Sequence, residues 1–454
     1  MKNVYFIGIG GIGMSAIARY YNYAGYKVSG YDRTPSKLTD KLQEEGIEIH
    51  FTDDFSYVPQ EIEETLVIYT PAIPADMGEL VYVKEKGYRL VKRSRALGEI
   101  ASEQQCLAIA GTHGKTTTST MLAHIYTHSG VGCNAFLGGI SKNYHTNLLL
   151  SKNRVIVAEA DEFDRSFLQL FPDIAAITST DADHLDIYGD LETIQGTFAE
   201  FAGQIKESGA LVVKKNIHID LKNVKAKTYT YSFKEDADFS PVNVEILEGG
   251  FFKFDLKWPD GIVENCQMGV PGWINAENGI AASAVALLGG VAPELVKEAL
   301  ATFQGAERRL DIHVNEAKAA YIDDYAHHPE ELSSAIGSIR NMFPGRRVCG
   351  IFQPHLFTRT RDFAPEFAQS LSQLDELLLL DIYPARELPI EGVTSEIIFK
   401  DVNLEKKQMI RKEDVVEHLK GRNDLDIVVT FGAGDIDRLI NPIKELVTEK
   451  AKQE

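Results

Sequence analysis

Leu107-Ala-Ile-Ala-Gly-Thr-His-Gly-Lys-Thr-Thr-Thr118 is the stretch that decides the fold of this 454-residue chain. Its first four residues are apolar or small and predict the end of a buried strand, and Gly114-Lys115-Thr116 opens a pattern typical of a helix. The glycine turn between them would place backbone N–H groups at a helix N-terminus, an arrangement that binds phosphate. We expect Lys115 to reach the β- and γ-phosphates of a nucleotide, and the Thr116 hydroxyl to hold Mg²⁺.

The match to the general phosphate-binding loop is incomplete. That pattern has a glycine five positions before Gly114, where this chain has Ile109; the glycine here is Gly111, so the loop is shorter. A glycine turn with an accidental Lys-Thr pair is the alternative interpretation. The strand and the helix on either side favour the phosphate loop.

Length and composition indicate a globular protein of about three domains. Of the 454 residues, 44% are apolar and 25% are charged. Sixty-six acidic against 47 basic residues give a net charge of −19, which argues against a nucleic-acid-binding or anionic-membrane surface. A local loop can still bind phosphate in an acidic protein.

The cysteines and the N-terminus predict a cytoplasmic protein. Cys106, Cys133, Cys266 and Cys349 are scattered without a CxxC pair, so we expect no disulfide framework, no zinc knuckle and a reducing compartment. The residues from Met1 lead directly into a strand and a glycine turn, which is not the pattern of a signal peptide. No apolar run approaches membrane-spanning length.

A second glycine loop lies at the start of the chain. A short apolar strand leads into Gly8-Ile-Gly-Gly-Ile-Gly13, a helix is expected over Met14–Ala24, and a second strand ends at Tyr31-Asp32. This is the Rossmann fingerprint, and by itself it predicts NAD. Physically it requires only a diphosphate at the helix N-terminus and a ribose or base near Asp32, which any nucleoside diphosphate satisfies. A purely structural glycine turn is the alternative.

Alternating strands and helices predict an α/β protein of three domains. These are a Rossmann-like domain (residues 1–104), a central phosphate-loop domain with a parallel sheet (105–312), and a second Rossmann-like domain (313–454). The period-two pattern from about Thr228 to Met268 predicts a small antiparallel sheet appended to the central domain, with a hairpin turn at Pro259-Asp-Gly261. We also expect a glycine turn at Phe136–Ile140 and an interdomain connection at Leu310–Ala319.

Polar side chains follow the strands of the central domain. Glu159 and Asp161 come after the next buried strand, where nucleotide hydrolases place a metal-binding acid. His184 lies in Asp-His-Leu-Asp, where it could bind a second Mg²⁺ or Mn²⁺; a hydrogen-bonded turn histidine is the equal alternative. The carboxyl ends of parallel strands are where open α/β sheets bind ligands.

The third domain carries two more polar clusters. Adjacent side chains point in different directions, so at most one of His327 and His328 is expected to face a site. Arg359 and Arg361 follow another strand and suit a carboxylate or phosphate by bidentate hydrogen bonds. A solvated, salt-bridged turn is the alternative for the arginines.

Together these motifs resemble the Mur ligases. The resemblance covers all three domains in chain order. It rests on Gly8–Met14, Gly111–Thr117, Glu159–Glu162, Asp183–Asp186, Asn275–Asn278, Asp324–Pro329, His355–Arg361 and Gly432–Asp435.

The resemblance implies an ATP-dependent amide ligation in peptidoglycan precursor synthesis. Its ligands would be ATP, Mg²⁺ with Mn²⁺ as a substitute, UDP-N-acetylmuramate and L-alanine, without nucleic acid or membrane insertion. The lactyl carboxylate would attack the γ-phosphate, and the alanine amine would then attack the acyl phosphate. A carboxylate attacking ATP brings two anions together, so cations such as Lys115 and Mg²⁺ must offset the repulsion.

The resemblance also implies a role for each matching residue. Thr116, Glu159 and His184 would bind metal; Lys115, His184, His327, His328 and Arg359 would be catalytic, with Arg359 on the alanine carboxylate and either His327 or His328 as the base. The ATP site would comprise Gly111, Thr112, Gly114, Lys115, Thr116, Thr117, Asn275, Asn278, Arg308, Arg309 and Asp324. The UDP-sugar site would comprise Gly8, Gly10, Gly11, Ile12, Gly13, Asp32, Thr70 and His113.

The chain departs from the family pattern at two places. Thr193–Phe198, where some members carry a carbamylated lysine, contains no lysine, so we expect no carbamate. Leu356 stands where an arginine often follows the equivalent of His355.

Three other functions remain to be weighed. One is a recycling ligase that adds an intact tripeptide to the same sugar nucleotide. Another is an NAD(P)-dependent oxidoreductase fused to a kinase-like domain, which leaves the two later clusters unexplained. The third is a non-enzymatic nucleotide-sensing protein, which would not need metal ligands on both central strands. We expect no NAD.

Overall fold

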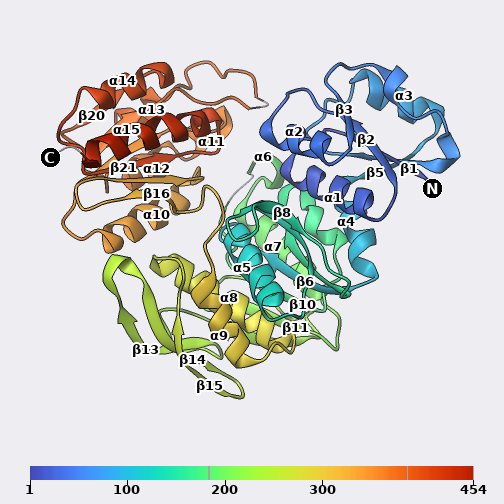
Figure 1. The fold of residues 1–454 in the computed structure, drawn as a ribbon, viewed down its shortest axis with the longest axis horizontal. Helices are drawn as coiled ribbons and strands as arrows, with labels where there is room; N and C mark the ends of the chain where they lie inside the picture. Colours follow the sequence, from blue (N-terminus) through green and yellow to red (C-terminus); the bar gives the residue numbers. More distant parts are fainter. Residues whose placement is uncertain (183–184, 386, 453–454) are drawn as a thin grey trace. The chain divides into compact units, whose positions relative to one another are not determined.

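The computed structural model describes residues 1–182, 185–385 and 387–452. They form four β-sheets, and the chain divides into two compact units (Figure 1). The first unit comprises Met1–Val244, Lys253–Gly269 and Glu277–Gln304; the second comprises Glu245–Phe252, Val270–Ala276 and Gly305–Glu454. Among the helices within the described ranges, none combines the length and apolar character that crossing a membrane requires.

The first sheet of unit 1 is the expected Rossmann-like sheet, and all its paired strands are parallel. Its strand order is β3-β2-β1-β4-β5, so the glycine loop follows the central strand. The strands are β1 (Asn3–Ile7), β2 (Lys27–Tyr31), β3 (Glu48–His50), β4 (Thr65–Tyr69) and β5 (Arg89–Lys92). The helices are α1 (Ile12–Tyr23), α2 (Lys37–Glu44), α3 (Gly78–Lys86) and α4 (Arg93–Ser102).

The second sheet of unit 1 carries the phosphate loop on its central strand, β6. Its order is β12-β11-β10-β6-β9-β7-β8, and only the β7–β8 pair is antiparallel among the pairs described. The strands are β6 (Gln105–Ala110), β7 (Asn134–Ser141), β8 (Thr146–Leu149), β9 (Val155–Ala160), β10 (Ile174–Ile177), β11 (Ala210–Lys214) and β12 (Lys227–Tyr231). The helices are α5 (Lys115–His128), α6 (Leu185–Tyr188), α7 (Leu191–Gly203), α8 (Trp273–Leu288) and α9 (Pro293–Thr302).

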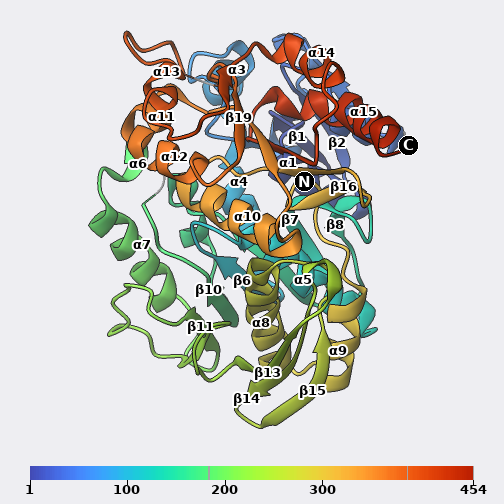
Figure 2. The same cartoon turned by 90° about the vertical axis from the view of Figure 1, so that its left-hand side faces the viewer.

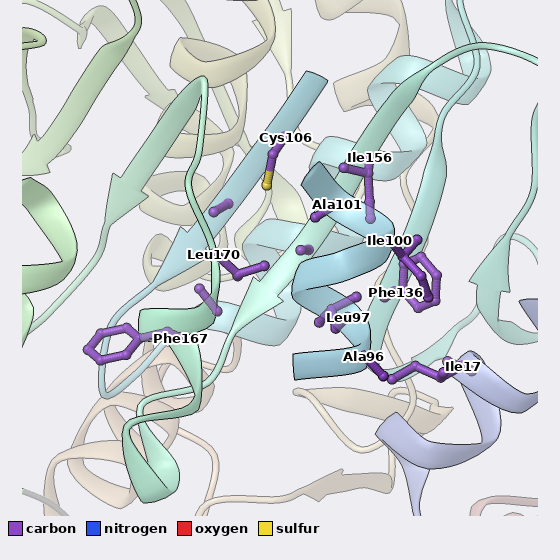
Figure 3. Close-up of a cluster of buried hydrophobic side chains, with 14 of the residues drawn as sticks. Ile17, Ala96, Leu97, Ile100, Ala101, Cys106, Phe136, Ile156, Phe167 and Leu170 are labelled. Atoms are coloured by element: carbon purple, nitrogen blue, oxygen red, sulfur yellow. The ribbon is translucent and has the colours of Figure 1, made fainter. Parts of the chain in front are cut away.

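These two sheets share one hydrophobic core. Figure 3 shows Leu97 and Ile100 of α4 between Ile17 of α1 and Phe136 and Ile156 of the second sheet. All five side chains are buried. Because burying apolar surface stabilises the packed state in proportion to its area, this core holds the first sheet's helices against the second sheet.

The glycine turn expected at Phe136–Ile140 is wrong, because these residues lie inside β7. The glycines instead allow the side chains of Glu159 and Thr116 to lie close to the β7 backbone. A Cβ at Gly138 would lie 2.3 Å from the Glu159 carboxylate, and one at Gly139 would lie 2.9 Å from Thr116.

The expected hairpin is confirmed, although the antiparallel region is shorter than predicted. β14 (Phe252–Trp258) pairs antiparallel with β15 (Gly261–Gln267), and β13 (Ser240–Ile246) completes a small sheet seen side by side in Figure 2. Thr228 was assigned to this sheet wrongly. It lies in β12, which pairs in parallel with β11; alternation of side chains occurs in parallel and antiparallel strands alike and does not reveal the partner.

Unit 2 is built on a mixed sheet of order β16-β17-β21-β18-β19-β20. We expected Leu310–Ala319 to be an interdomain connection, and this is wrong. The segment contains β16, which pairs antiparallel with β17. The strands are β16 (Asp311–Asn315), β17 (Ala320–Asp324), β18 (Val348–Phe352), β19 (Glu376–Leu379), β20 (Lys407–Met409) and β21 (Ile427–Phe431). The helices are α10 (Pro329–Met342), α11 (Phe357–Asp362), α12 (Ala364–Leu371), α13 (Glu396–Phe399), α14 (Val415–Lys420) and α15 (Ile440–Lys452).

A buried histidine sits in the helix that follows the phosphate loop. His124 of α5 is 4% exposed; its ring contacts the Tyr144 hydroxyl at 2.8 Å through Nδ1 and Thr302 Oγ1 at 3.0 Å through Nε2. Burial, with the neighbouring His128, lowers the pKa of His124 to about 4. The folded protein therefore holds this ring neutral.

We expect His124 to make the protein less stable in acid. Because its folded pKa lies below the ordinary value near 6.5, the unfolded chain binds the extra proton between about pH 6.5 and pH 4. Stability falls as the pH decreases through that window, by up to roughly 3 kcal/mol. Burial raises the pKa of Glu79 to about 7 and that of Asp324 to about 6. These two carboxyl groups bind protons more readily in the folded state, so their contribution to stability increases as the pH falls.

A comparison with His124→Gln isolates the histidine. Urea unfolding at about pH 7 and about pH 5 should show a larger loss of stability in the wild-type chain than in the variant. His218→Gln, at an exposed histidine, is the matched control and should retain the wild-type difference. Equal losses in all three proteins would contradict the prediction.

Candidate active site

The phosphate loop has a backbone that only glycine adopts without strain. Gly111 has φ 138° and Gly114 has φ 81°, both in the region that favours glycine. A Cβ at Gly111 would lie 2.0 Å from Thr178 Oγ1, so this glycine is also required for space. The helix α5 begins directly after Gly114, as predicted.

Residues that follow β10 hold the phosphate loop by hydrogen bonds. The backbone N–H of His113 donates to Ser179 Oγ at 2.7 Å, and Thr178 Oγ1 donates to the His113 carbonyl. Thr112 Oγ1 accepts from the Asp181 N–H at 3.1 Å. Sequence reasoning did not assign Thr178 and Ser179; their position after the neighbouring strand was the available signal.

Lys115 pairs with a carboxylate that the sequence analysis left without a role. Its Nζ lies 2.8 Å from Glu162 Oε2 and donates to the Gly111 carbonyl at 2.6 Å. Glu162 is only 2% exposed. Burial by itself would lower the pKa of Lys115, but Glu162, Asp161 and Glu159 outweigh it and raise that pKa, so the ammonium is fully charged.

Two of the three expected metal ligands come together. Thr116 Oγ1 donates to Glu159 Oε1 at 3.1 Å, and the other carboxylate oxygen accepts from the Gly138 N–H at 3.0 Å. A hydroxyl and a carboxylate are oxygen ligands of the kind Mg²⁺ prefers. His184, the third expected ligand, lies outside the described residues.

The expected adenine-recognising asparagines lie in the first turns of α8. Asn278 is close to the phosphate loop, since a Cβ at Gly114 would lie 2.8 Å from its Oδ1. Asn275 is 6% exposed and donates to the Pro271 carbonyl at 2.7 Å, so part of its amide supports the helix entrance.

Most residues predicted for the sugar-nucleotide site lie at the first glycine loop. Gly11 caps α1, which begins at Ile12. A Cβ at Gly8 would lie 2.9 Å from Thr70. Asp32 Oδ2 accepts from the Gly10 N–H at 2.7 Å, so this carboxylate shapes the loop itself.

Arg93 is a cation beside this loop that the sequence analysis missed. A Cβ at Gly13 would lie 2.8 Å from its Nη1, and its Nη2 lies 3.1 Å from Asp161 Oδ2. It connects the glycine loop to the strand end that carries Glu159. Its place after β5, an edge strand distant from the loop in sequence, gave no local signal. His113, also expected near the sugar nucleotide, lies 3.6 Å from Asp181.

In unit 2, both arginines expected at the ATP site lie near one aromatic ring. The guanidinium carbons of Arg308 and Arg309 lie 5.1 and 4.9 Å from the centre of the Tyr325 ring, within cation–π range. Arg308 also pairs with Asp323 at 2.9 Å. Asp324 accepts from the N–H groups of Leu310 and Ala326, both at 2.7 Å.

The adjacent histidines point to different neighbours, as expected. His328 is 4% exposed, caps α10 and lies against the Phe363 ring. The His327 ring lies 5.9 Å from that of His355 and 3.2 Å from the Glu331 carboxylate.

The two arginines after β18 differ in environment. Arg359 is 7% exposed, whereas Arg361 pairs with its exposed neighbour Asp362 at 2.7 Å. A buried guanidinium is the better placed to hold a carboxylate in a fixed orientation, since Arg361 is solvated.

Comparison with known proteins reveals a family over most of the chain. Residues 3–105 match the "Mur ligase family, catalytic domain", residues 109–286 the "Mur ligase middle domain", and residues 308–434 the "Mur ligase, glutamate ligase domain".

Individual relatives cover nearly the whole chain. The UDP-N-acetylmuramate–L-alanine ligase of Porphyromonas gingivalis is 50% identical over 451 residues, covering 98% of this chain and 99% of the relative. That of Flavobacterium johnsoniae is 48% identical, covering 99% and 98%. The crystal structure of the UDP-N-acetylmuramate–alanine ligase of Thermotoga maritima has a TM-score of 0.82 at 25% identity and 98% coverage of both chains.

Proposed function

The chain belongs to the Mur ligase family, and from this we propose that it joins L-alanine to the lactyl carboxylate of UDP-N-acetylmuramate while ATP is cleaved to ADP and phosphate. The observation that carries the proposal is the 50% identity, over 98% of this chain, to a relative named for that reaction. The charged Lys115 at a glycine loop and the Thr116–Glu159 pair fit the ATP-dependent step.

The first step requires two anions to meet. A lactyl carboxylate oxygen attacks the γ-phosphorus, the bond from phosphorus to the β–γ bridging oxygen breaks, and ADP leaves. Lys115, held in the charged state by neighbouring carboxylates, offsets this repulsion. The N–H groups at the start of α5 bind the phosphate oxygens.

The metal implied by the family fits the oxygen donors in place. Thr116 Oγ1 and Glu159 Oε1, which lie 3.1 Å apart, would hold Mg²⁺ or Mn²⁺, with His184 as the further expected ligand. When bound, the ion would neutralise charge on the transferred phosphoryl group. No NAD and no carbamylated lysine enter this mechanism.

The second step requires a neutral amine. Arg359 would hold the alanine carboxylate, and His327 would accept the ammonium proton. We favour His327 because His328 caps a helix and is almost fully buried. The free amine then attacks the acyl carbonyl, and phosphate leaves.

The glycine loop Gly8–Gly13 would bind the UDP diphosphate at the N-terminus of α1, with Arg93 as an additional cation beside it. Asp32, Thr70 and His113 complete the proposed sugar-nucleotide site. Asn278, beside Gly114, with Asn275, Arg308, Arg309 and Asp324, completes the proposed ATP site.

A phosphate-release assay tests the function. Phosphate should form from ATP only when both UDP-N-acetylmuramate and L-alanine are present, and a sugar-nucleotide product heavier by one alanine residue should be found by mass spectrometry. Parallel reactions with glycine, L-serine and the intact tripeptide test selectivity. Phosphate release with neither substrate, faster ligation of the tripeptide, or oxidation of NADH would overturn the assignment.

A further inference from the structure

The β7–β8 hairpin (Asn134–Leu149) contacts both nucleotide loops of unit 1. On one strand, Gly138 and Gly139 lie against Glu159 and Thr116 beside the phosphate loop. The other strand, β8, packs against α1, the helix that begins at the first glycine loop (Figure 2). One short element therefore touches the supports of both loops.

Asn147 of β8 makes the contact with the first glycine loop. Its side chain is fully buried at 0% exposure, and its Nδ2 donates to the Ile12 carbonyl at 2.7 Å and to Ser15 Oγ at 2.9 Å. Ser15 Oγ also donates to the Ile12 carbonyl at 2.9 Å. Both amide hydrogens are thus used on the first turn of α1, where the diphosphate is expected.

Arg19, one turn further along α1, braces the same contact. Its Nη1 donates to Thr146 Oγ1 at 2.5 Å and to Asn147 Oδ1 at 3.3 Å. Its Nε and Nη2 bind both carboxylate oxygens of Glu45 at 2.6 and 2.7 Å. A bidentate pair fixes the guanidinium plane, so the amide of Asn147 is held in one orientation.

We propose that Asn147 is a positioning residue that fixes the sugar-nucleotide loop relative to the ATP phosphate loop. The inference rests on the proposed function, in which the lactyl carboxylate must lie about 3–3.5 Å from the γ-phosphorus. The two substrates are held by loops on different sheets, so a small rotation of α1 on β8 moves the carboxylate away from the phosphate. A displacement of about 1 Å can cost roughly 10²-fold in rate.

The shared hydrophobic core does not replace this contact. Its apolar side chains favour close packing but not one rotation, because the hydrophobic effect has no direction. Hydrogen bonds from a single buried amide to Ile12 and Ser15 do specify direction.

Asn147→Ala tests the proposal in the full-length protein. Losing the buried amide should lower the melting temperature, but the Ile12 carbonyl keeps its bond from Ser15 Oγ and the shared core is untouched, so the variant should remain folded at the assay temperature. We expect kcat to fall about 10- to 100-fold, while KM for ATP and the calorimetric Kd for UDP-N-acetylmuramate each change less than about 3-fold. Ser15→Ala should also lower kcat with little change in KM for ATP or in Kd for UDP-N-acetylmuramate, but by a smaller factor.

Asn143→Ala is the matched control on the same hairpin. Asn143 donates to the Thr302 carbonyl and accepts from the Gln304 N–H, away from the first glycine loop. Its kcat should stay within about 2-fold of wild type. Equal losses in both variants, or none in Asn147→Ala, would overturn the proposal. An inactive wild-type protein would instead overturn the proposed function, and this inference with it.

Discussion

Replacing Lys115 with alanine is expected to abolish turnover, with a loss in kcat of at least ~10³-fold. The ammonium lies on the proposed phosphate loop, and removing it leaves the repulsion between the carboxylate and the γ-phosphate without the protein cation proposed to offset it. Calorimetry should show nearly unchanged affinity for UDP-N-acetylmuramate, because its proposed glycine loop follows β1 on another sheet. Phosphate release measured at saturating ATP gives the rate.

The variant also removes the ammonium group that pairs with the buried Glu162 carboxylate, which is costly. The double variant K115A/E162Q removes both charges. It should melt at a higher temperature than Lys115→Ala and remain inactive. Lys152→Ala, at an exposed lysine in the same unit, should match wild type. Substantial activity in the double variant, or a large loss of sugar-nucleotide affinity, would contradict the proposed role of Lys115.

Gly138→Ala is expected to reduce kcat by about 10²-fold or more. The added methyl group would lie 2.3–2.5 Å from the Glu159 carboxylate atoms, so this carboxylate must leave the position in which it accepts from Thr116. Gly138 lies in β7 without a positive φ, so the backbone itself accepts alanine. Because the displaced group is the expected metal ligand, the Mg²⁺ concentration that gives half-maximal rate should rise.

A second glycine substitution controls for the general effect of alanine. Gly196 lies in α7 with no atom within 4 Å of a Cβ, and Gly196→Ala should keep full activity and gain about 0.5–1 kcal/mol of stability. If Gly138→Ala retains the wild-type rate and metal dependence, Glu159 does not act from the position seen here.

Much of the candidate site was predictable because its signals are local. A glycine with positive φ followed by Lys-Thr at a helix start specifies a phosphate loop within a few residues, and Gly111 and Gly114 adopt that backbone. The resemblance implied that Thr116 and Glu159 act together; the structure has Thr116 after β6 and Glu159 near the carboxyl end of the neighbouring parallel strand β9.

The errors concern which segment of the chain each residue lies against. Gly138 and Gly139 predicted a turn, because glycine marks turns when only neighbours in the chain are considered; their real role is to make room for Glu159 and Thr116. Thr228 lies in β12, which pairs in parallel with the preceding strand β11, and Leu310–Ala319 contains β16, which pairs antiparallel with the next strand, β17. Strand pairing depends on which segment lies alongside, and alternation of side chains does not reveal it.

By itself the sequence determined the family and the α/β class, and it located the two glycine loops at the starts of α1 and α5, since each follows from residue types at short spacings. Only the tertiary structure decided that Glu162 is the partner of Lys115, that Arg93 lies beside Gly13, and that Asn147 holds the start of α1. Those contacts join residues 47 to 135 positions apart. No local propensity encodes them. The Lys115–Glu162 contact depends on the pairing of β6 with β9, and the Arg93 and Asn147 contacts depend on the core that the two sheets of unit 1 share.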